Sequence, residues 1–407
     1  MSERRVGIWM IGAFGGVGST TALGLAALAR GLTPQTGLAT ALPEFAALPF
    51  DAAAQFVVGG HDIRQTSFGR TVAELHSRSN VFADPLLTAC LPQLDEWSAN
   101  VRPGVLYRPN AILNSLADRP GLLLAATPRE AIRQIQSDLR AFAAKFALSQ
   151  VVVVNVASTE PIFAAGPEVE SLAALNAALD KPDAVSLPMS SLYAYAAVDA
   201  GFPYLNGTPS LGATVPALEE LAKLRTVPLA GQDFKTGETL MKAVLAPMFR
   251  KRNLRVMSWV GHNILGNRDG LILSDPANKA TKVKSKDALL GEILGYKPQS
   301  HVSIEYIESL DDWKTAWDHI HYEGFLGVKM TLQFTWQGCD SMLAAPLALD
   351  VARILLLAQR RGESGTLAAT AAFFKSPMGG VTEQDFGLQF TMLTDYLSPP
   401  SPANPRP

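Results

Sequence analysis

A short apolar strand that runs into a glycine-rich loop constrains the fold of this chain more than any other feature. Residues 5–11 read Arg5-Val-Gly-Ile-Trp-Met-Ile11, the loop follows as Gly12-Ala-Phe-Gly-Gly-Val-Gly18, and an Ala/Leu-rich helix is expected from Ser19 to Arg30. This order begins a doubly wound parallel sheet. Backbone N–H groups and a helix N-terminus in such a loop can bind a pyrophosphate. Because the spacing is G-x-x-G-G-x-G, a plain tight turn stays open beside the nucleotide site.

The charge balance narrows the class of ligand. The 407 residues carry 35 Lys+Arg and 37 Asp+Glu, which argues against a nucleic-acid or anionic-membrane binder. Only two cysteines are present, Cys90 and Cys339, so we expect a reducing, cytoplasmic environment. The loop glycines argue against a signal peptide at the start. We expect no transmembrane segment, because the longest later apolar stretch, Leu343 to Gln359, contains Asp350 and Arg353.

Further strands and helices continue an α/β pattern. The run Gln150-Val-Val-Val-Val-Asn-Val156 is typical of a buried parallel strand, and its polar end, residues 155–159, is where such sheets bind ligands. Residues 69–145 hold mainly helical patterns, with a clear helix at 128–147. Two more strands are expected, at 36–42 and within 56–64.

The second half predicts an inserted α+β domain at 237–337 between two parts of the Rossmann-type domain, residues 1–236 and 338–396. Within it we expect helices at 236–252 and 311–323 and strands at 254–260, 301–308 and 329–336. An apolar helix at 342–361 would pack back on the first domain. The proline-rich residues 397–407 are expected to form a loose tail.

An acidic residue is needed to bind the adenosine ribose in a conventional dinucleotide site. The expected strand at 36–42 ends without one, and the nearest candidate is Asp62 in Gly59-Gly-His-Asp-Ile-Arg64. Asp62 fits a ribose ligand and a turn-capping aspartate equally well.

Polar residues gather between 231 and 376 without a packing reason. Lys282 and Lys286 are spaced four apart on a possible helical face. From spacing alone, ordinary solvated lysines are the favoured interpretation.

Several motifs in one order resemble the inositol-3-phosphate synthase family, in its shorter archaeal-type branch. They are Gly59 to Arg64, Val153 to Pro161, Leu192 to Ala197, Asp233 to Thr239, Asn263 to Gly266, Asp340 to Asp350 and Phe373 to Met378. The resemblance runs from the glycine loop to Lys375. It implies NAD as cofactor and conversion of D-glucose 6-phosphate to 1D-myo-inositol 3-phosphate, through oxidation at C5, enolisation, aldol closure and reduction. It also implies a homotetramer whose inserted sheets pair across subunits.

The resemblance assigns site residues as well. Four active-site lysines are implied: Lys282 for proton transfer, Lys314 and Lys375 for oxyanion stabilisation, and Lys286 for the phosphate. Around the nicotinamide and substrate it places Asp233, Asn263, Asn267, Asp269, Asp312, Asp340 and Ser341. Around the rest of NAD it places Gly15, Gly16, Val17, Gly18, Asp62, Ser158 and Thr159. A divalent metal ion is a further possibility, with Asp233 and Asp269 as suitable oxygen ligands.

Three departures from the family pattern keep alternatives open. Gly16-Val17 replaces an asparagine pair in the glycine loop, and Gly261-His-Asn263 stands where Ser-Tyr-Asn is usual. Arg268 replaces an asparagine or tyrosine, so it either binds the cofactor or sugar phosphate or is solvated. The alternatives are a synthase making another cyclitol phosphate, a sugar-phosphate dehydrogenase and an inactive NAD-binding assembly protein.

Overall fold

Every residue of the first strand is buried, because its side chains enter two different cores in turn. In the computed structural model, which describes residues 4–109, 111–181, 187–267 and 289–398, Val6, Ile8 and Met10 of β1 (Val6–Ile11) lie in one core. Trp9 and Ile11 lie in the other, on the opposite face of the sheet. This two-sided burial explains the continuous apolar run of the central strands.

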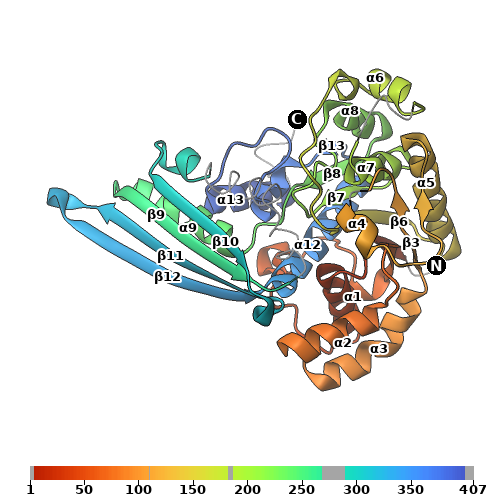
Figure 1. Cartoon of the computed structure of the whole chain (residues 1–407), viewed down its shortest axis with the longest axis horizontal. Helices are drawn as coiled ribbons and strands as arrows, with labels where there is room; N and C mark the ends of the chain where they lie inside the picture. Colours follow the sequence, from red (N-terminus) through yellow and green to blue (C-terminus); the bar gives the residue numbers. More distant parts are fainter. Residues whose placement is uncertain (1–3, 110, 182–186, 268–288, 399–407) are drawn as a thin grey trace.

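The main sheet is parallel and has the order β13-β8-β7-β6-β1-β2-β3 (Figure 1). Its remaining strands are β2 (Phe56–Asp62), β3 (Val101–Pro103), β6 (Gln150–Asn155), β7 (Tyr204–Asn206), β8 (Pro228–Gly231) and β13 (Gly365–Thr366). β1 pairs with β6 on one side and with β2 on the other. The direction of winding therefore reverses at β1, which is the switch point where open α/β sheets bind ligands.

Helices cover both faces, as predicted for a doubly wound sheet. One core includes side chains of α1 (Gly16–Ala29), α2 (Phe68–Ser79), α3 (Asp84–Ser98) and α12 (Asp340–Arg360). The other includes α5 (Pro128–Lys145), α6 (Leu172–Ala178), α7 (Met189–Asp199) and α8 (Pro216–Arg225). The body also contains α4 (Ala111–Leu116), the pair β4 (Val105–Leu106) and β5 (Leu123–Leu124), and α13 (Phe386–Leu397). The 3-10 helices are Ala39–Ala41, Pro43–Phe45, Ala53–Gln55, Pro167–Val169, Glu308–Leu310, Phe325–Gly327 and Ala368–Phe373.

A second sheet, ordered β10-β9-β11-β12, projects from one side of this α/β body (Figure 1). Its strands are β9 (Arg255–Leu265), β10 (Gln299–Tyr306), β11 (Trp313–Glu323) and β12 (Lys329–Cys339), and α9 (Gly237–Lys251) packs on it. The predicted helix at 236–252 and the strands near 254, 301 and 329 are confirmed. The domain boundaries at 237 and 337 stay a prediction.

The predicted helix at 311–323 is wrong, because these residues form the strand β11. β11 pairs along its length with β9 and β12, so its backbone groups are used between strands. Its burial alternates with a period of two: Ala316, Asp318 and Ile320 are buried, whereas Trp317 and His319 are exposed. A charged residue among the buried positions hides this alternation in the sequence.

The predicted strand at 36–42 is also wrong, because its middle forms the 3-10 helix Ala39–Ala41. Asp350 of α12 accepts hydrogen bonds from the N–H groups of Ala39 (2.7 Å) and Thr40 (2.9 Å). It also accepts one from the Thr40 hydroxyl at 2.6 Å. Backbone donors that a strand would give to its neighbour are thus used by a carboxylate distant in sequence.

The helix α12 has 21 residues, and it is long and apolar enough by length and composition to cross a membrane. Its apolar stretch is nevertheless 78% buried inside the molecule. The helix packs on α1 and β6, as predicted for residues 342–361, and is a core helix of the α/β body. Of the predicted tail, residues 399–407 lie outside the described part, and Leu397 ends α13.

Candidate functional site

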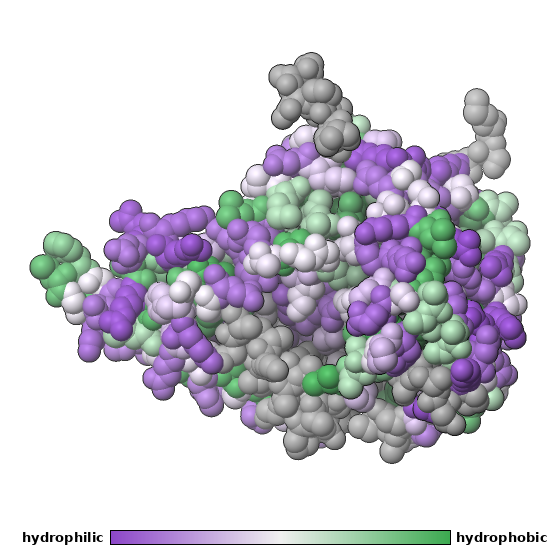
Figure 2. All heavy atoms as spheres, turned by 90° about the horizontal axis from the view of Figure 1, so that it is seen from above, coloured by the Kyte–Doolittle hydropathy of each residue, from purple (hydrophilic) through white to green (hydrophobic). Residues whose placement is uncertain are grey.

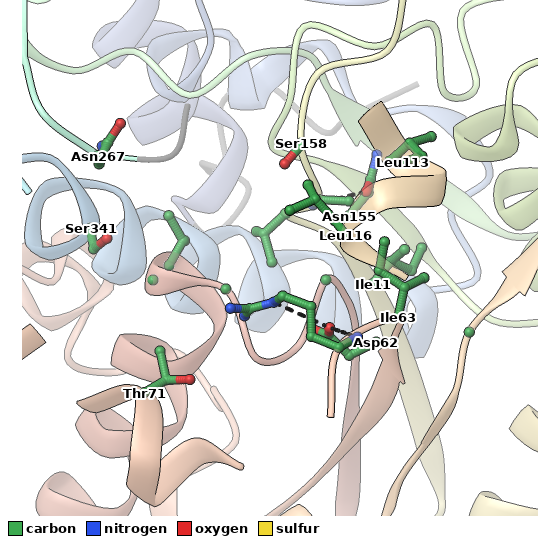
Figure 3. A pocket seen from close by; sticks show the side chains of 18 of the residues that line it. Ile11, Asp62, Ile63, Thr71, Leu113, Leu116, Asn155, Ser158, Asn267 and Ser341 are labelled. Carbon is green, nitrogen blue, oxygen red and sulfur yellow. Dashed lines mark hydrogen bonds and ion pairs between the residues drawn. The ribbon is translucent and has the colours of Figure 1, made fainter. Parts of the chain in front are cut away.

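A cavity of about 480 Å³ opens at the carboxyl ends of β1, β2 and β6. The glycine loop, the start of α12 and the segment at Asn267 also line it, as Figure 3 shows from close by. From the predicted set, its wall includes Gly15, Gly16, Val17, Asp62, Ser158, Asn267, Asp312, Asp340 and Ser341. Segments more than 300 residues apart in sequence therefore meet at one site.

The glycine loop approaches its neighbours too closely for side chains. A Cβ at Gly16 would overlap the hydroxyl of Ser341, and a Cβ at Gly18 would overlap the carbonyl oxygen of Ala13. The first turn of α1 has no side-chain cap and no acidic residue. Its N–H groups and helix dipole therefore favour an anion, and the glycine loop with the first turn of α1 fits the pyrophosphate of a dinucleotide.

Asp62 is the last residue of β2, and its carboxylate is hydrogen-bonded to the glycine loop. Its carboxylate accepts hydrogen bonds from the N–H of Phe14 at 2.7 Å and the N–H of Arg64 at 2.9 Å. Because a carboxylate has about four acceptor positions, these bonds leave capacity for a ribose hydroxyl. The turn-capping role is therefore present, and the ribose role stays a prediction.

Asp312 organises the side of the cavity at α12. It accepts hydrogen bonds from the Ser341 N–H (2.9 Å), the Ser341 hydroxyl (3.1 Å) and the Cys339 thiol (2.8 Å). Asn267 donates to Asp312 at 3.3 Å and to Asp340 at 3.5 Å. Burial, together with the nearby charge of Asp340, raises the pKa of the Asp312 carboxyl. The structure brings the four predicted residues of this region, Asn267, Asp312, Asp340 and Ser341, together.

Two predicted lysines each pair with a predicted aspartate. The Lys314 ammonium lies 3.6 Å from the carboxylate of Asp340, which lines the cavity. The Lys375 ammonium lies 2.8 Å from Asp233. Asp233 is joined to the cavity through Thr208, because the Asp233 N–H donates to its carbonyl (3.1 Å) and Asn155 donates to its hydroxyl (3.3 Å).

Other predicted residues lie elsewhere. Asn263 is fully buried and donates to Glu238 at 2.6 Å, away from the cavity wall. Gly18 and Thr159 do not line the cavity. Lys282, Lys286, Arg268 and Asp269 lie outside the described residues.

Sequence reasoning missed several groups at or near the site. Arg64 and Glu160 line the cavity, and burial raises the pKa of Glu160 although it accepts hydrogen bonds from the Ser190 N–H. Both stand in motifs that carried the resemblance. The buried ion pair of Lys242 with Glu238, at 2.6 Å, was also missed. Its spacing of four residues in a helix was the available signal.

A family model for myo-inositol-1-phosphate synthase matches residues 6–397 of this chain. The chain belongs to the myo-inositol-1-phosphate synthase family. The model describes an NAD-binding domain, so NAD is the cofactor of this family member. The predicted family and cofactor are confirmed.

Two relatives and one solved structure show how far this family likeness extends. Inositol-3-phosphate synthase 1 of Bacteroides thetaiotaomicron is 34% identical, over 97% of this chain and 95% of its own length. Inositol-3-phosphate synthase 1 of Oryza sativa subsp. japonica is 35% identical, over 63% of this chain and 52% of its own. The structure of inositol-3-phosphate synthase from Caenorhabditis elegans superposes with a TM-score of 0.85 at 24% identity, covering 97% of this chain and 85% of that one. At this identity the last match supports the fold of the family alone.

Proposed function

We propose that this enzyme is an isomerase that converts D-glucose 6-phosphate to 1D-myo-inositol 3-phosphate. The observation that carries the proposal is the position of the two lysine–aspartate pairs, Lys314 with Asp340 and Lys375 with Asp233, beside a dinucleotide cavity. A dehydrogenase needs no such set of cations beyond those that bind its substrate. When bound, NAD supplies the oxidation of C5 and the final reduction.

The chain's own residues serve the steps between these two. Removal of a proton from C6 and attack of the resulting enolate on the C1 aldehyde both develop negative charge on oxygen. A C1–C6 bond forms, and the aldehyde oxygen takes up a proton to become a hydroxyl. Lys314 and Lys375 would stabilise the oxyanions, because preorganised ammonium groups act most strongly on charge that develops during the reaction.

The paired carboxylates have a separate role. Asp233 and Asp340 hold the ammonium groups in place through their ion pairs with Lys375 and Lys314. Lys282 would take the C6 proton and Lys286 would bind the phosphate. The assignment of roles to all four lysines rests on the family pattern.

A divalent metal ion remains part of the proposal. The described residues contain no group of three or more His, Cys, Asp or Glu side chains that would hold one. Asp233 would have to act with the substrate and with Asp269. Chelation with EDTA followed by readdition of Mg²⁺ or Zn²⁺ tests this: unchanged turnover throughout would exclude a required metal.

Location and assembly complete the proposal. The buried free thiols Cys90 and Cys339 support a reducing cytoplasmic environment.

The projecting sheet supports a homotetramer, because apolar side chains at its far end are exposed. Phe325 and Leu326 are 87% and 84% exposed at the β11–β12 turn, the green end of the molecule in Figure 2.

Redox balance is the decisive test. Enzyme, glucose 6-phosphate and a catalytic amount of NAD should give inositol phosphate without lasting absorbance from NADH, and NMR identifies the product. Stoichiometric accumulation of NADH would instead establish a dehydrogenase. A different cyclitol phosphate from another hexose phosphate would keep the mechanism and change the substrate.

A further inference from the structure

Arg64 stands between the two features that define the cofactor site, the glycine loop and Asp62. It follows the end of β2 by two residues and lines the cavity. Its Nη2 group donates a hydrogen bond to the carbonyl oxygen of Phe14, inside the glycine loop. Its Nε atom lies 3.6 Å from the Asp62 carboxylate, the ion pair drawn at Asp62 in Figure 3. These contacts fix the guanidinium beside the loop.

The Arg64 guanidinium is a cation in a cavity wall that otherwise carries mostly carboxylates. Of the described residues that line the cavity, two are arginines, and the second, Arg78, is 71% exposed and lies 3.6 Å from Asp311. His61 also lines the cavity, but burial lowers its pKa and favours the neutral ring. The wall carries several carboxylates: Asp62, Glu74, Glu160, Asp311, Asp312 and Asp340. A doubly charged anion placed there needs a cation close to the loop.

The loop itself supplies backbone donors and no polar side chain at Val17. A guanidinium has five N–H donors in a rigid fork, and Arg64 uses one of them in its bond to Phe14. The side chain is 20% exposed, so part of the fork faces solvent or a ligand. Arginine forks match phosphate oxygens in geometry and charge.

We propose that Arg64 binds the pyrophosphate of NAD, making it a cofactor-binding residue in addition to the backbone of the glycine loop. Its bond to Phe14 aims the guanidinium at the phosphates, and Asp62 limits its movement. This inference concerns the cofactor site and is independent of which sugar phosphate the enzyme converts.

Binding measurements without sugar phosphate test the proposal. In calorimetric titrations, Arg64→Ala should raise the Kd for NAD and for ADP-ribose by about 10- to 100-fold, the range for a charge-assisted hydrogen bond. The Kd for adenosine, which has no phosphate, should stay within about twofold. Arg64→Lys should recover part of the loss, because it keeps the charge and loses the fork. The matched control Arg225→Ala, which removes an arginine paired with Asp199 at 2.6 Å outside the cavity wall, should change NAD binding by less than about threefold.

Three results would overturn the proposal. Equal losses for adenosine and ADP-ribose would mean that Arg64 only braces the loop. A larger loss for NADP than for NAD would assign it to a 2′-phosphate. Unchanged NAD binding would leave the pyrophosphate to the backbone alone. Melting temperatures identify a variant that fails to fold, in which case Arg64→Lys carries the test. Because no turnover is measured, failure of the cyclisation reaction would not affect these outcomes.

Discussion

A backbone hydrogen bond, in addition to the ion pair of the side chains, fixes the positions of Lys375 and Asp233 relative to each other. The Lys375 N–H donates to the carbonyl oxygen of Asp233 at 2.7 Å, and Asp233 has a φ of 63°, in the left-handed region that aspartate tolerates. The two side chains are 16% and 11% exposed. Their geometry is therefore set by the chain itself, and the ammonium needs little reorganisation during a reaction.

We expect Lys375→Ala to lower turnover by at least about a hundredfold while NAD binding persists, because its charge acts on an oxyanion that forms during the reaction. Steady-state kinetics and NAD titration measure the two quantities. The control is Lys251→Ala, which removes a lysine that is paired with Asp385 at 2.7 Å and that the family pattern does not assign to the site. Near-normal turnover of Lys375→Ala would remove this lysine from the mechanism.

Lys235 is a buried lysine whose charge is costly. It is 3% exposed, it donates to Gln389, and burial lowers its pKa to about 7. Between this pKa and the usual value near 10.4, the unfolded chain binds the proton more strongly. The free energy of unfolding should therefore rise with pH above about 7, with this group contributing up to about 1.4 kcal/mol per pH unit. Below the folded pKa this contribution is absent.

Urea unfolding at pH 6.5, 7.5 and 8.5 measures this dependence. In Lys235→Met the lysine contribution should vanish, so the difference in stability between the variant and the wild type should be largest at low pH. A difference that stays constant over this pH range would show that the lysine is protonated throughout.

At the level of elements, hydrogen bonds to Asp350 decide the shape of residues 36–42. Sequence patterns predicted β1, β2, β6, α9 and α12, because each has a regular apolar period of its own. They failed where a partner distant in sequence decides the conformation. Hydrogen bonds to Asp350 stabilise the 3-10 helix Ala39–Ala41, and pairing with β9 and β12 stabilises the strand at residues 313–323. Because residues 36–42 do not form a strand of the sheet, β2 pairs directly with β1 and places Asp62 beside it.

Asp350→Ala should destabilise the fold by about 3–5 kcal/mol, because it removes the acceptor of the Ala39 and Thr40 N–H groups and a negative charge near the Arg353 guanidinium. Chemical unfolding gives the change in free energy. Asp84, whose side chain is 84% exposed, provides the control, and Asp84→Ala should cost about 1 kcal/mol or less. Similar costs for both variants would rule out the anchoring role of Asp350.

At the scale of the whole molecule, the α/β body and the projecting sheet contribute different walls of the site. The sequence predicted a ligand site at the polar end of the strand at 150–156, because that end follows directly on the apolar run. The roles of the four lysines stay a prediction. It could not predict that Asp312, next to β11, accepts a hydrogen bond from the N–H of Ser341 in the first turn of α12. The hydroxyl of the same serine lies next to Gly16. That arrangement depends on contacts between the two sheets.

The exposed end of the projecting sheet gives a test of assembly. Under the proposed homotetramer, Phe325→Asp combined with Leu326→Asp should shift the assembly toward smaller species, because it places charges on the exposed apolar end of the sheet. Light scattering after size-exclusion chromatography measures the mass. Leu124→Asp, at a 66% exposed position on the α/β body, is the control. An unchanged mass for the double variant would place the interface elsewhere.

The meeting of Gly16 with Ser341 has a consequence for biosynthesis. The ribosome completes the glycine loop first and the start of α12 more than 300 residues later. At about 5–20 residues per second, the nascent loop waits on the order of tens of seconds for its opposite wall. A chain whose translation stops before residue 340 lacks Asp340 and Ser341, which form part of the cavity wall. The cavity wall of the folded enzyme is therefore complete only after translation has passed residue 341.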